Sequence, residues 1–478
     1  MAAIFKTSLK DNQEYWLAPH DSWGVCLQSD YNAPVQLPKK GWDSRSMWLQ
    51  LEDKLLASFS QSKLLVVSEE PDYEHTTATF FQTGWKKGSA FSVLTGNLIG
   101  CVRFGNLELE VTSRFGNYFL QYIITDADGF VPISELGGET DLPSGYQWLL
   151  AFLWSSRLRR AYRLGMPKKY LTECETLGFI RGEISPVDYY VSGTIGKWKC
   201  TYRNLSYNTL AAELICAAYH IIRTKAECAF ACSGVHNIYQ TFMQATIGKR
   251  SRRKELLDVP YFTNSFYMEY NRVIDLSKLI LRYWGSEYSG ADDSEAIFFD
   301  VAMLFEFYVR KLLIRNGFSM RRKEDTLHYI PTIPMTGNYS RKLIPDLVFE
   351  LSHGIGVFDV IYKSYDTKYG VSRDDLFQLH TYIGQYGNET SVSVCGFVYP
   401  IKESRRRTLR SPENTEQVVL LKQIRQQNKD IPFAVGFIVI PDNSTSGTWH
   451  DFNIQMTKWA SLFIEQMKHL TDGFKAQP

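Results

Sequence analysis

The sequence predicts a multidomain protein of mixed α+β and α/β class, with a β-rich N-terminal region, a helical middle region and a C-terminal domain in which helices flank a central sheet. A chain of 478 residues is too long for one ordinary domain. Its hydrophobic content of 44% and aromatic content of 14% can fill several cores and argue against disorder. The spacing of apolar residues also changes along the chain, from that of strands to that of helices and then to both in alternation.

The first region, residues 1–142, is predicted to be a β-rich N-terminal domain. Short runs of β-branched and aromatic residues between Ala90 and Phe119 are separated by Gly-Asn pairs, and Gly105-Asn106 is a plausible hairpin turn. A half-buried strand is predicted where three apolar residues alternate with polar ones, namely Leu107, Leu109 and Val111.

The middle region, residues 143–290, is predicted to be a mainly helical domain. Apolar residues at helical spacing predict helices over Tyr146–Leu164, Asn208–Thr224 and Tyr267–Trp284, and these stripes are typical of core packing. The polar, glycine-containing segment 285–295 is interpreted as the linker to the last domain.

The last region, residues 291–478, is predicted to be an α/β domain. A helix from Ala296 to Arg315 is expected to end at Asn316-Gly317, a typical C-cap sequence. Strand-like runs alternate with further helices, the strands at 344–351, 357–363, 392–399 and 433–440 and the helices at 373–386 and 454–470.

Composition limits the possible functions. The net charge of +2 says little about partners, so a nucleic-acid surface would have to come from local basic clusters. Each cluster is either a solvated surface or a phosphate contact, and those in the last domain are the better candidates. The clusters are Lys249-Arg250, Arg252-Arg253-Lys254, Arg321-Arg322-Lys323 and Arg405-Arg406-Arg407.

Other patterns point to a cytoplasmic protein without nucleotide chemistry of its own. The N-terminus resembles no secretory signal, and the most apolar stretch, Tyr146–Trp154, is far shorter than the roughly 20 residues of a membrane span. The scattered cysteines, including Cys228 and Cys232, are expected to be buried thiols. No G-x-x-x-x-G-K-[ST] loop occurs, so the chain is not expected to hydrolyse nucleotides.

An acidic pair occurs in the segment Ile344–Lys363, which predicts a hairpin with Asp346 on its first strand and Asp359 on its second. Two carboxylates at neighbouring strand ends can hold a hard divalent cation, which can activate water for phosphodiester cleavage, and a lysine can stabilise the transition-state charge. The alternative is that both aspartates are solvated residues at strand ends. Helices on either side favour the nuclease reading, since one carries Glu306 and the other carries Gln378 and Tyr382 on one face.

The order of these residues resembles the PD-(D/E)xK nuclease core, and the chain as a whole resembles the McrC family. FEFYVRKLL is similar to the family's F-E-x-Y-V motif, PDLVF…FDVIYK to its PD…D-x-K-Y hairpin, and RDDLFQLHTY to its D-x-Y-Q-x-x-x-Y helix. GFVYP, RGEI, CTYRNLSYNTLAAELICAA and TGNLIGCVRFGNLELEVTSRFG resemble further segments, so the similarity spans about residues 95 to 445.

One position departs from the family pattern. Ile361 stands where the family has its catalytic lysine, and Lys363 follows two residues later. On a continuous strand both would face the side of Asp359, with Lys363 displaced by about 7 Å. A relocated lysine and an inactive site both stay open, and the relocated lysine is favoured because its flexible stem could cover much of that distance.

The resemblance implies a DNA endonuclease subunit that works with a McrB-like AAA+ hexamer, a GTPase or an ATPase, on modified or phage DNA. It implies that the N-terminal domain, residues 1–142, docks on this motor together with the middle region, and that the C-terminal domain cuts. It also implies that Asp346 and Asp359 bind Mg²⁺, with Glu306 as a further ligand or orienter. Lys363 would steady the phosphate, and Gln378 and Tyr382 would position the hairpin or the DNA. The main rival is a non-catalytic adaptor that binds and activates the motor, and a DNA-binding repair protein is a third possibility.

Overall fold

The computed structural model describes most of the chain. The described residues are 5–20, 24–29, 32–35, 45–60, 65–67, 80–86, 90–104, 107–127, 147–184, 187, 189–190, 196–225, 228–247, 251–284, 296–322, 324–331, 340–387, 390–406, 417–426, 429–442 and 448–472. The chain forms two compact units, one made of residues 1–130 with 291–478 and the other of residues 131–290. Within the described part, no helix is both long and apolar enough to cross a membrane.

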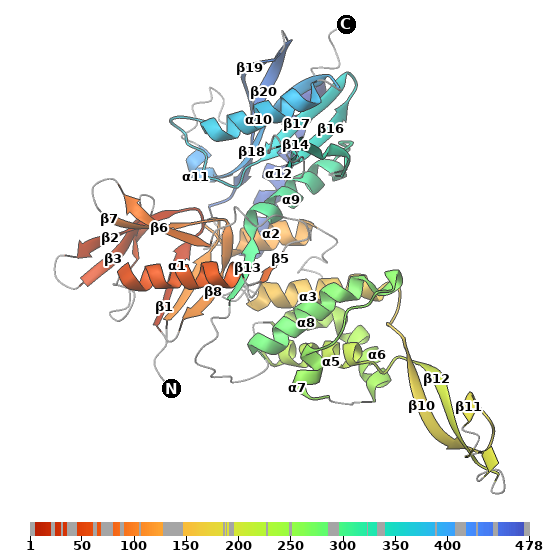
Figure 1. The fold of residues 1–478 in the computed structure, drawn as a ribbon. Helices are drawn as coiled ribbons and strands as arrows, with labels where there is room; N and C mark the ends of the chain where they lie inside the picture. The colour runs from red at the N-terminus through yellow and green to blue at the C-terminus, as the bar shows by residue number, and fades with distance from the viewer. Residues whose placement is uncertain are drawn as a thin grey trace. The chain divides into compact units, whose positions relative to one another are not determined.

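The N-terminal part of the first unit contains two five-stranded sheets (Figure 1). One has the order β1-β9-β8-β13-β5, with strands Phe5–Lys10, Leu107–Thr112, Leu98–Phe104, Ala296–Asp300 and Leu65–Val67. The other has the order β4-β3-β2-β7-β6, with strands Asn32–Val35, Gly24–Ser29, Glu14–His20, Ala90–Thr95 and Phe81–Lys86. Helices α1 (Arg45–Ser60) and α2 (Asn117–Ala127) complete this part.

The predicted strand at 107–112 is confirmed as β9. Leu109 and Val111 are fully buried while Glu110 and Thr112 between and after them are less so, as the alternation predicts. The strand pairs in parallel with β1 and antiparallel with β8. The predicted turn at Gly105-Asn106 lies outside the described residues.

The helix expected from Ala296 begins later than predicted. Residues Ala296–Asp300, with the strand-favouring sequence AIFFD, form β13, which pairs antiparallel with β8 of the N-terminal sheet. Helix α9 then runs over Val301–Arg315, and the Asp300 side chain caps it by accepting from the amides of Ala302 and Met303. The predicted end is confirmed, since Asn316 is the C-cap and Gly317 follows at φ +95°.

A further five-stranded sheet forms the C-terminal part of the first unit, in the order β16-β17-β18-β20-β19. Its strands are Leu347–Leu351, Gly354–Val360, Val392–Lys402, Lys429–Ile440 and Val418–Gln426. The neighbouring helices are α10 (Arg373–Tyr386), α11 (Glu403–Arg406) and α12 (Trp449–Asp472), and β14 (His328–Pro331) pairs with β15 (Ser340–Leu343). Strands interleaved with helices are therefore confirmed here, but the second strand of the hairpin ends at Val360 and not at 363.

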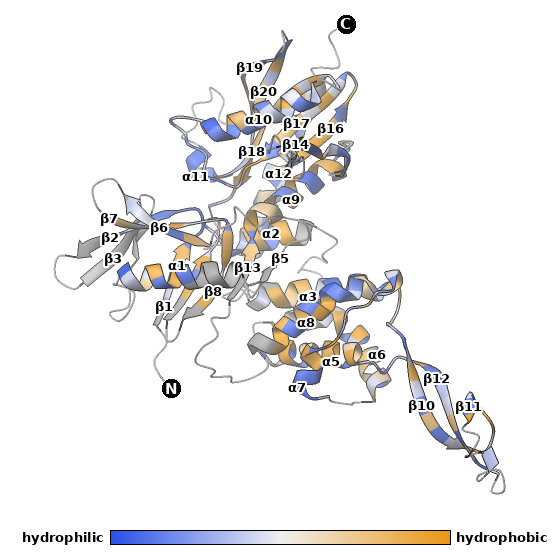
Figure 2. Ribbon diagram, in the orientation of Figure 1, coloured by the Kyte–Doolittle hydropathy of each residue, from blue (hydrophilic) through white to orange (hydrophobic). Residues whose placement is uncertain are grey.

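The second unit combines helices with a β-ribbon. Three predicted helices are confirmed as α3 (Gln147–Tyr162), α5 (Leu210–Thr224) and α8 (Glu269–Trp284), which carry both hydrophobic and hydrophilic residues (Figure 2). Helices α6 (His236–Thr246) and α7 (Arg253–Leu257) and the 3₁₀ turns η3 (Ala229–Val235) and η4 (Ser265–Tyr267) also belong to this unit. Cys228 and Cys232 are buried free thiols, as expected, and burial raises the pKa of Cys232 to about 12.

The ribbon was not predicted. Strand β10 (Lys169–Leu177) pairs antiparallel with β12 (Trp198–Ser206), and β11 (Glu183–Ile184) adds to the other edge of β12. Residues along it are largely exposed, so the half-buried alternation by which the strand at 107–112 was found is weak here.

Candidate active site

The hairpin β16–β17 brings the two predicted aspartates together. Asp346 lies directly before β16, and Asp359 is the penultimate residue of β17. The antiparallel register pairs Leu347 with Phe358, so the two aspartates occupy the next position along the ladder. One carboxylate oxygen of Asp346, Oδ2, accepts a hydrogen bond of 2.8 Å from the amide of Val360. The carboxyl of Asp359 in turn forms hydrogen bonds with the backbone and side chain of Asp346.

Glu306 is the third acidic group at this place. It lies in the second turn of α9, and it and Asp359 are 6% and 5% exposed. Burial raises the pKa of Asp359 to about 6, and the neighbouring charge of Glu306 adds to this rise while the hydrogen bonds from Asp346 oppose it. Glu306 and Asp346 therefore both lie close enough to Asp359 to affect its charge.

Helix α10 contributes Tyr382 and Gln378. The Gln378 amide donates a hydrogen bond of 2.7 Å to the Tyr382 hydroxyl, as expected for residues four apart on one helix face. Burial raises the pKa of Tyr382, and the charges of Asp359, Asp346 and Glu306 raise it further. The phenol is therefore neutral at ordinary pH and keeps a proton that it can donate.

Lys363 does not lie on the strand that carries Asp359. The chain leaves the strand after Val360, and the next two residues, Ile361 and Tyr362, are both buried. Ile361 packs in the apolar core with Val348 and Tyr382. Residues 359, 361 and 363 would share one face only if β17 continued to residue 363, but the strand ends at Val360.

The ammonium group of Lys363 instead pairs with Asp375, at 3.0 Å from Oδ1. Asp375 lies in the first turn of α10, where a carboxylate is favoured, and its amide donates to the N-cap Ser372. Its charge also contributes to the raised pKa of Asp359. Sequence reasoning missed Asp375, although its place in the first turn of the predicted helix marked it as a capping acid.

Arg310 is a second residue that the sequence did not single out. It lies one turn after Glu306 on α9, and its Nη1 donates to the carbonyl oxygen of Asp346 at 3.0 Å, while Nη2 donates to the carbonyl of Arg321. The signal was weak, because an arginine on a predicted amphipathic helix usually faces solvent. This guanidinium fixes the backbone of Asp346 relative to the helix of Glu306.

The donor set suits a hard cation, although it is not an assembled metal site. Asp346, Asp359 and Glu306 offer carboxylate oxygens, which are the ligands that Mg²⁺ prefers. The raised pKa of Asp359 results first from burial and then from neighbouring negative charge, and a bound cation would offset both. Among the residues that the structure describes, however, no three acidic, histidine or cysteine side chains are already grouped as a metal site. Asp346, Asp359 and Glu306 are the residues that would hold the ion.

The comparison with known families identifies the chain. A family model described as "McrBC 5-methylcytosine restriction system component" matches residues 93–400.

The chain belongs to this McrBC family.

The fold is similar to a chain of the Thermococcus gammatolerans assembly of McrB AAA+ hexamers with bound McrC. The TM-score is 0.53 at 14% sequence identity, covering 97% of this chain and 100% of that chain. The cryo-EM structure of the McrBC complex of the same organism gives a TM-score of 0.36 at 14% identity, covering 67% of this chain and 90% of that chain. No curated protein sequence matches.

The McrBC family match encloses all six residues predicted for the site, from Glu306 to Tyr382. It ends near the close of β18, so β20, β19 and α12 lie beyond it. The mixed α/β fold with several sheets that the resemblance implied is therefore present in this McrBC chain.

The basic clusters are partly structural. Arg253 donates to the carbonyl of Leu281 at 2.7 Å, Arg321 pairs with Glu350 at 2.7 Å, and the guanidinium of buried Arg406 lies over the Trp459 ring at 4.8 Å. These contacts favour a structural role for the three arginines. Lys249-Arg250, Lys323 and Arg407 lie outside the described residues.

Proposed function

We propose that the chain is the endonuclease subunit of a McrBC-like restriction complex, which cuts DNA by Mg²⁺-dependent phosphodiester hydrolysis. The convergence of Asp346, Asp359 and Glu306 beside Tyr382 is the observation that carries this proposal. Asp359 is a buried carboxyl group with a raised pKa beside two other acidic groups, and such perturbed groups are typical of functional sites.

In this proposal, Asp346, Asp359 and Glu306 hold the ion. Bound Mg²⁺ supplies activation of water and neutralisation of charge on the scissile phosphate. Arg310 fixes the backbone of Asp346, and the hydroxyl of Tyr382, which accepts from Gln378, directs its proton toward the acids. The Lys363 side chain is 60% exposed, so its ammonium can contact the phosphate from the solvent side while Asp375 limits its range.

The proposed partner is a McrB-like AAA+ hexamer that hydrolyses nucleotide. The solved chain of similar fold belongs to an assembly of such hexamers with McrC. In the second unit of this chain, large apolar side chains are exposed around the ribbon β10-β12-β11, namely Tyr170, Phe179, Ile180, Val187, Tyr189 and Tyr190. Tyr170 lies on β10 and the others lie in the connections between the three strands. Exposed apolar groups on neighbouring segments are typical of protein contacts, so we assign the ribbon and its connections to the motor.

The decisive experiment is a cleavage assay with modified DNA, partner, nucleotide and Mg²⁺. Asp346→Ala and Asp359→Ala are expected to abolish cleavage while they still stimulate nucleotide hydrolysis by the partner. Asp325→Ala is the matched control, because this aspartate lies in the turn η5 (Glu324–Thr326) of the same unit. Normal cleavage by both site variants would overturn the proposal.

A non-catalytic adaptor is the second candidate, and the burial of Ile361 favours it. Ile361 fills the core at the position where the family has its lysine, and Lys363 is paired with Asp375. If the wild-type chain activates the motor but does not cut, while Ile361→Lys cuts, the adaptor function is correct.

A further inference from the structure

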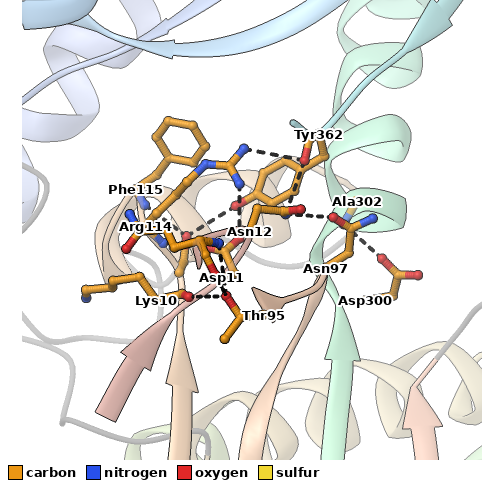
Figure 3. A network of polar contacts seen from close by, with 12 residues as sticks. Lys10, Asp11, Asn12, Thr95, Asn97, Arg114, Phe115, Asp300, Ala302 and Tyr362 are labelled. Carbon is orange, nitrogen blue, oxygen red and sulfur yellow. Dashed lines mark hydrogen bonds and ion pairs between the residues drawn. The ribbon is translucent and has the colours of Figure 1, made fainter. Parts of the chain in front are cut away.

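A buried ion pair lies where strands β1 and β9 end (Figure 3). The guanidinium Nη1 of Arg114 is 3.9 Å from Oδ2 of Asp11, and the two side chains are 5% and 0% exposed. The other carboxylate oxygen of Asp11 accepts from the backbone amide of Arg114, and the Asp11 amide donates to the carbonyl of Thr112 at 2.9 Å. The pair is therefore fixed at both its side chains and its backbone.

The guanidinium of Arg114 extends from this pair to Tyr362 in the C-terminal part of the same unit. Its Cζ lies 4.6 Å from the centre of the Tyr362 ring and 4.7 Å from that of Phe115. Its Nη2 donates to the carbonyl oxygen of Tyr362 at 3.4 Å. An arginine suits this place because its planar group can stack on rings and donate in its plane at once.

Two further N-terminal residues hold Tyr362. The side-chain amide of Asn12 donates to the same carbonyl at 3.3 Å and to Oδ1 of Asn97 at 2.7 Å. Asn12 adopts φ +48°, a conformation that asparagine tolerates better than most residues. The hydroxyl of Tyr362 is 3.3 Å from Oγ of Ser113. The carbonyl and the hydroxyl of Tyr362 are thus both in contact with residues that adjoin the strands of the N-terminal sheet.

In the sequence, Tyr362 lies between the candidate acid Asp359 and the candidate lysine Lys363. It follows Asp359 by three residues and directly precedes Lys363. The same sheet also fixes where α9 begins. Its strand β13 pairs with β8 and ends at Asp300, which is the N-cap of α9, the helix that carries Glu306. One sheet therefore fixes two separate elements of the candidate site.

We propose that Asp11 and Arg114 are positioning residues that hold the segment Ile361–Lys363 through Tyr362, so that the N-terminal sheet is part of the working nuclease site. This inference rests on the proposed nuclease function. It assigns to residues more than 200 positions away in the sequence a role in orienting Lys363 and the end of β17.

The energetics of the pair support a role in geometry. Burial raises the pKa of Asp11, and the charge of Arg114 only partly offsets this. Buried ion pairs often add no more stability than well-packed apolar residues of similar size would. An apolar residue in place of Arg114 could not make its contacts with the carbonyl of Tyr362 and with the rings of Tyr362 and Phe115.

The test compares Arg114→Lys and Tyr362→Phe with the wild-type complex. Arg114→Lys keeps the charge but loses the planar contacts with Tyr362, and Tyr362→Phe removes only the hydroxyl. Leu51→Ala is the control for lost stability, because Leu51 is buried on α1, which packs against β6. The readouts are kcat and KM of DNA cleavage, stimulation of the partner's nucleotide hydrolysis, and Mn²⁺ binding measured by calorimetry.

We expect Arg114→Lys to lower kcat about 10- to 100-fold, as small misplacements of catalytic groups do. The KM for DNA, partner stimulation and Mn²⁺ affinity should stay close to wild type, and Leu51→Ala should keep its kcat despite its lower Tm. Tyr362→Phe should lower kcat in the same direction but less, which keeps the test decisive if Arg114→Lys does not fold.

Three results would overturn the inference. Unchanged kcat in both variants would leave the nuclease function intact and refute positioning by Arg114. An equal fall of kcat in Leu51→Ala would show a general loss of stability. Absence of cleavage by the wild type, at the level of Asp346→Ala, would refute the nuclease function and this inference with it.

Discussion

The ammonium of Lys363 lies 3.0 Å from the carboxylate of Asp375, with the lysine side chain 60% exposed and the aspartate side chain 7% exposed. The buried partner anchors a cation that otherwise reaches into solvent. A pair of this kind can hold a lysine ready beside a reacting phosphate, or keep it away from one.

Lys363→Ala separates these possibilities. If Lys363 stabilises the phosphate, cleavage should fall about 100- to 1,000-fold, as when one oxyanion-binding donor is removed. Steady-state cleavage with the partner present measures this. The matched control is Lys368→Ala, an exposed lysine whose ammonium lies over the Tyr369 ring. Full activity of Lys363→Ala would exclude this lysine from catalysis.

Arg310→Lys should weaken the link between α9 and Asp346. A lysine cannot donate to the carbonyls of Asp346 and Arg321 at once, so we expect about a tenfold loss of cleavage and a loss of about 1–3 kcal/mol in the free energy of unfolding. Urea unfolding and cleavage assays measure the two effects. Arg315→Lys, on the exposed face of the same helix, should change neither.

Divalent metal should stabilise the wild-type protein against heat. An ion that binds only the folded state adds about 2.7 kcal/mol at a concentration of 100 times its Kd. Scanning calorimetry with and without Mn²⁺ should show a rise in Tm for the wild type and a much smaller rise for Asp346→Ala and Glu306→Gln. Equal shifts in all three proteins would place the ion elsewhere.

Gly354→Ala tests the turn that sets the hairpin register. Gly354 has φ +125°, and a Cβ there would lie 2.0 Å from the carbonyl oxygen of Ser391. We expect a loss of more than about 2 kcal/mol in the free energy of unfolding, because the clash adds to the backbone strain. Gly317→Ala is the matched control, since Gly317 has φ +95° with no atom within 4 Å of the added Cβ, and should cost only about 1 kcal/mol.

Tyr190→Ser, combined with Phe179→Ser, should impair the motor contact. These side chains are 80% and 61% exposed near the ribbon. Stimulation of the partner's nucleotide hydrolysis should fall at least about tenfold, the scale of an interface hot spot, with the Tm unchanged. Tyr369→Ser provides the control, because Tyr369 is 77% exposed in the other unit. Wild-type stimulation by the double variant would remove the ribbon from the interface.

The hairpin and its acids could be predicted because the information is local. Two short apolar runs joined by a polar, glycine-containing turn define β16 and β17, and Asp346 and Asp359 lie at the ends of these runs. The capped end of α9 at Asn316-Gly317 was readable for the same reason.

What escaped prediction depends on partners distant in the sequence. Nothing in AIFFD indicates that it pairs with β8, and nothing near Tyr362 indicates Arg114, 248 residues earlier. The face on which Lys363 lies could not be predicted, because the spacing of apolar residues does not show where a strand ends. Ile361 and Tyr362 are both apolar enough to be buried, and the core accepts both.

Strand β13 has a practical consequence for dissecting the molecule. A fragment that starts at residue 291 would contain β13 without its partners β8 and β5. The unpaired backbone groups of this strand could then pair with another chain, so we expect the fragment to aggregate. Replacing residues 131–290 with a flexible linker would instead keep every strand of that sheet in the protein. This shortened protein would show whether the unit that carries the candidate active site can fold without the unit assigned to the motor.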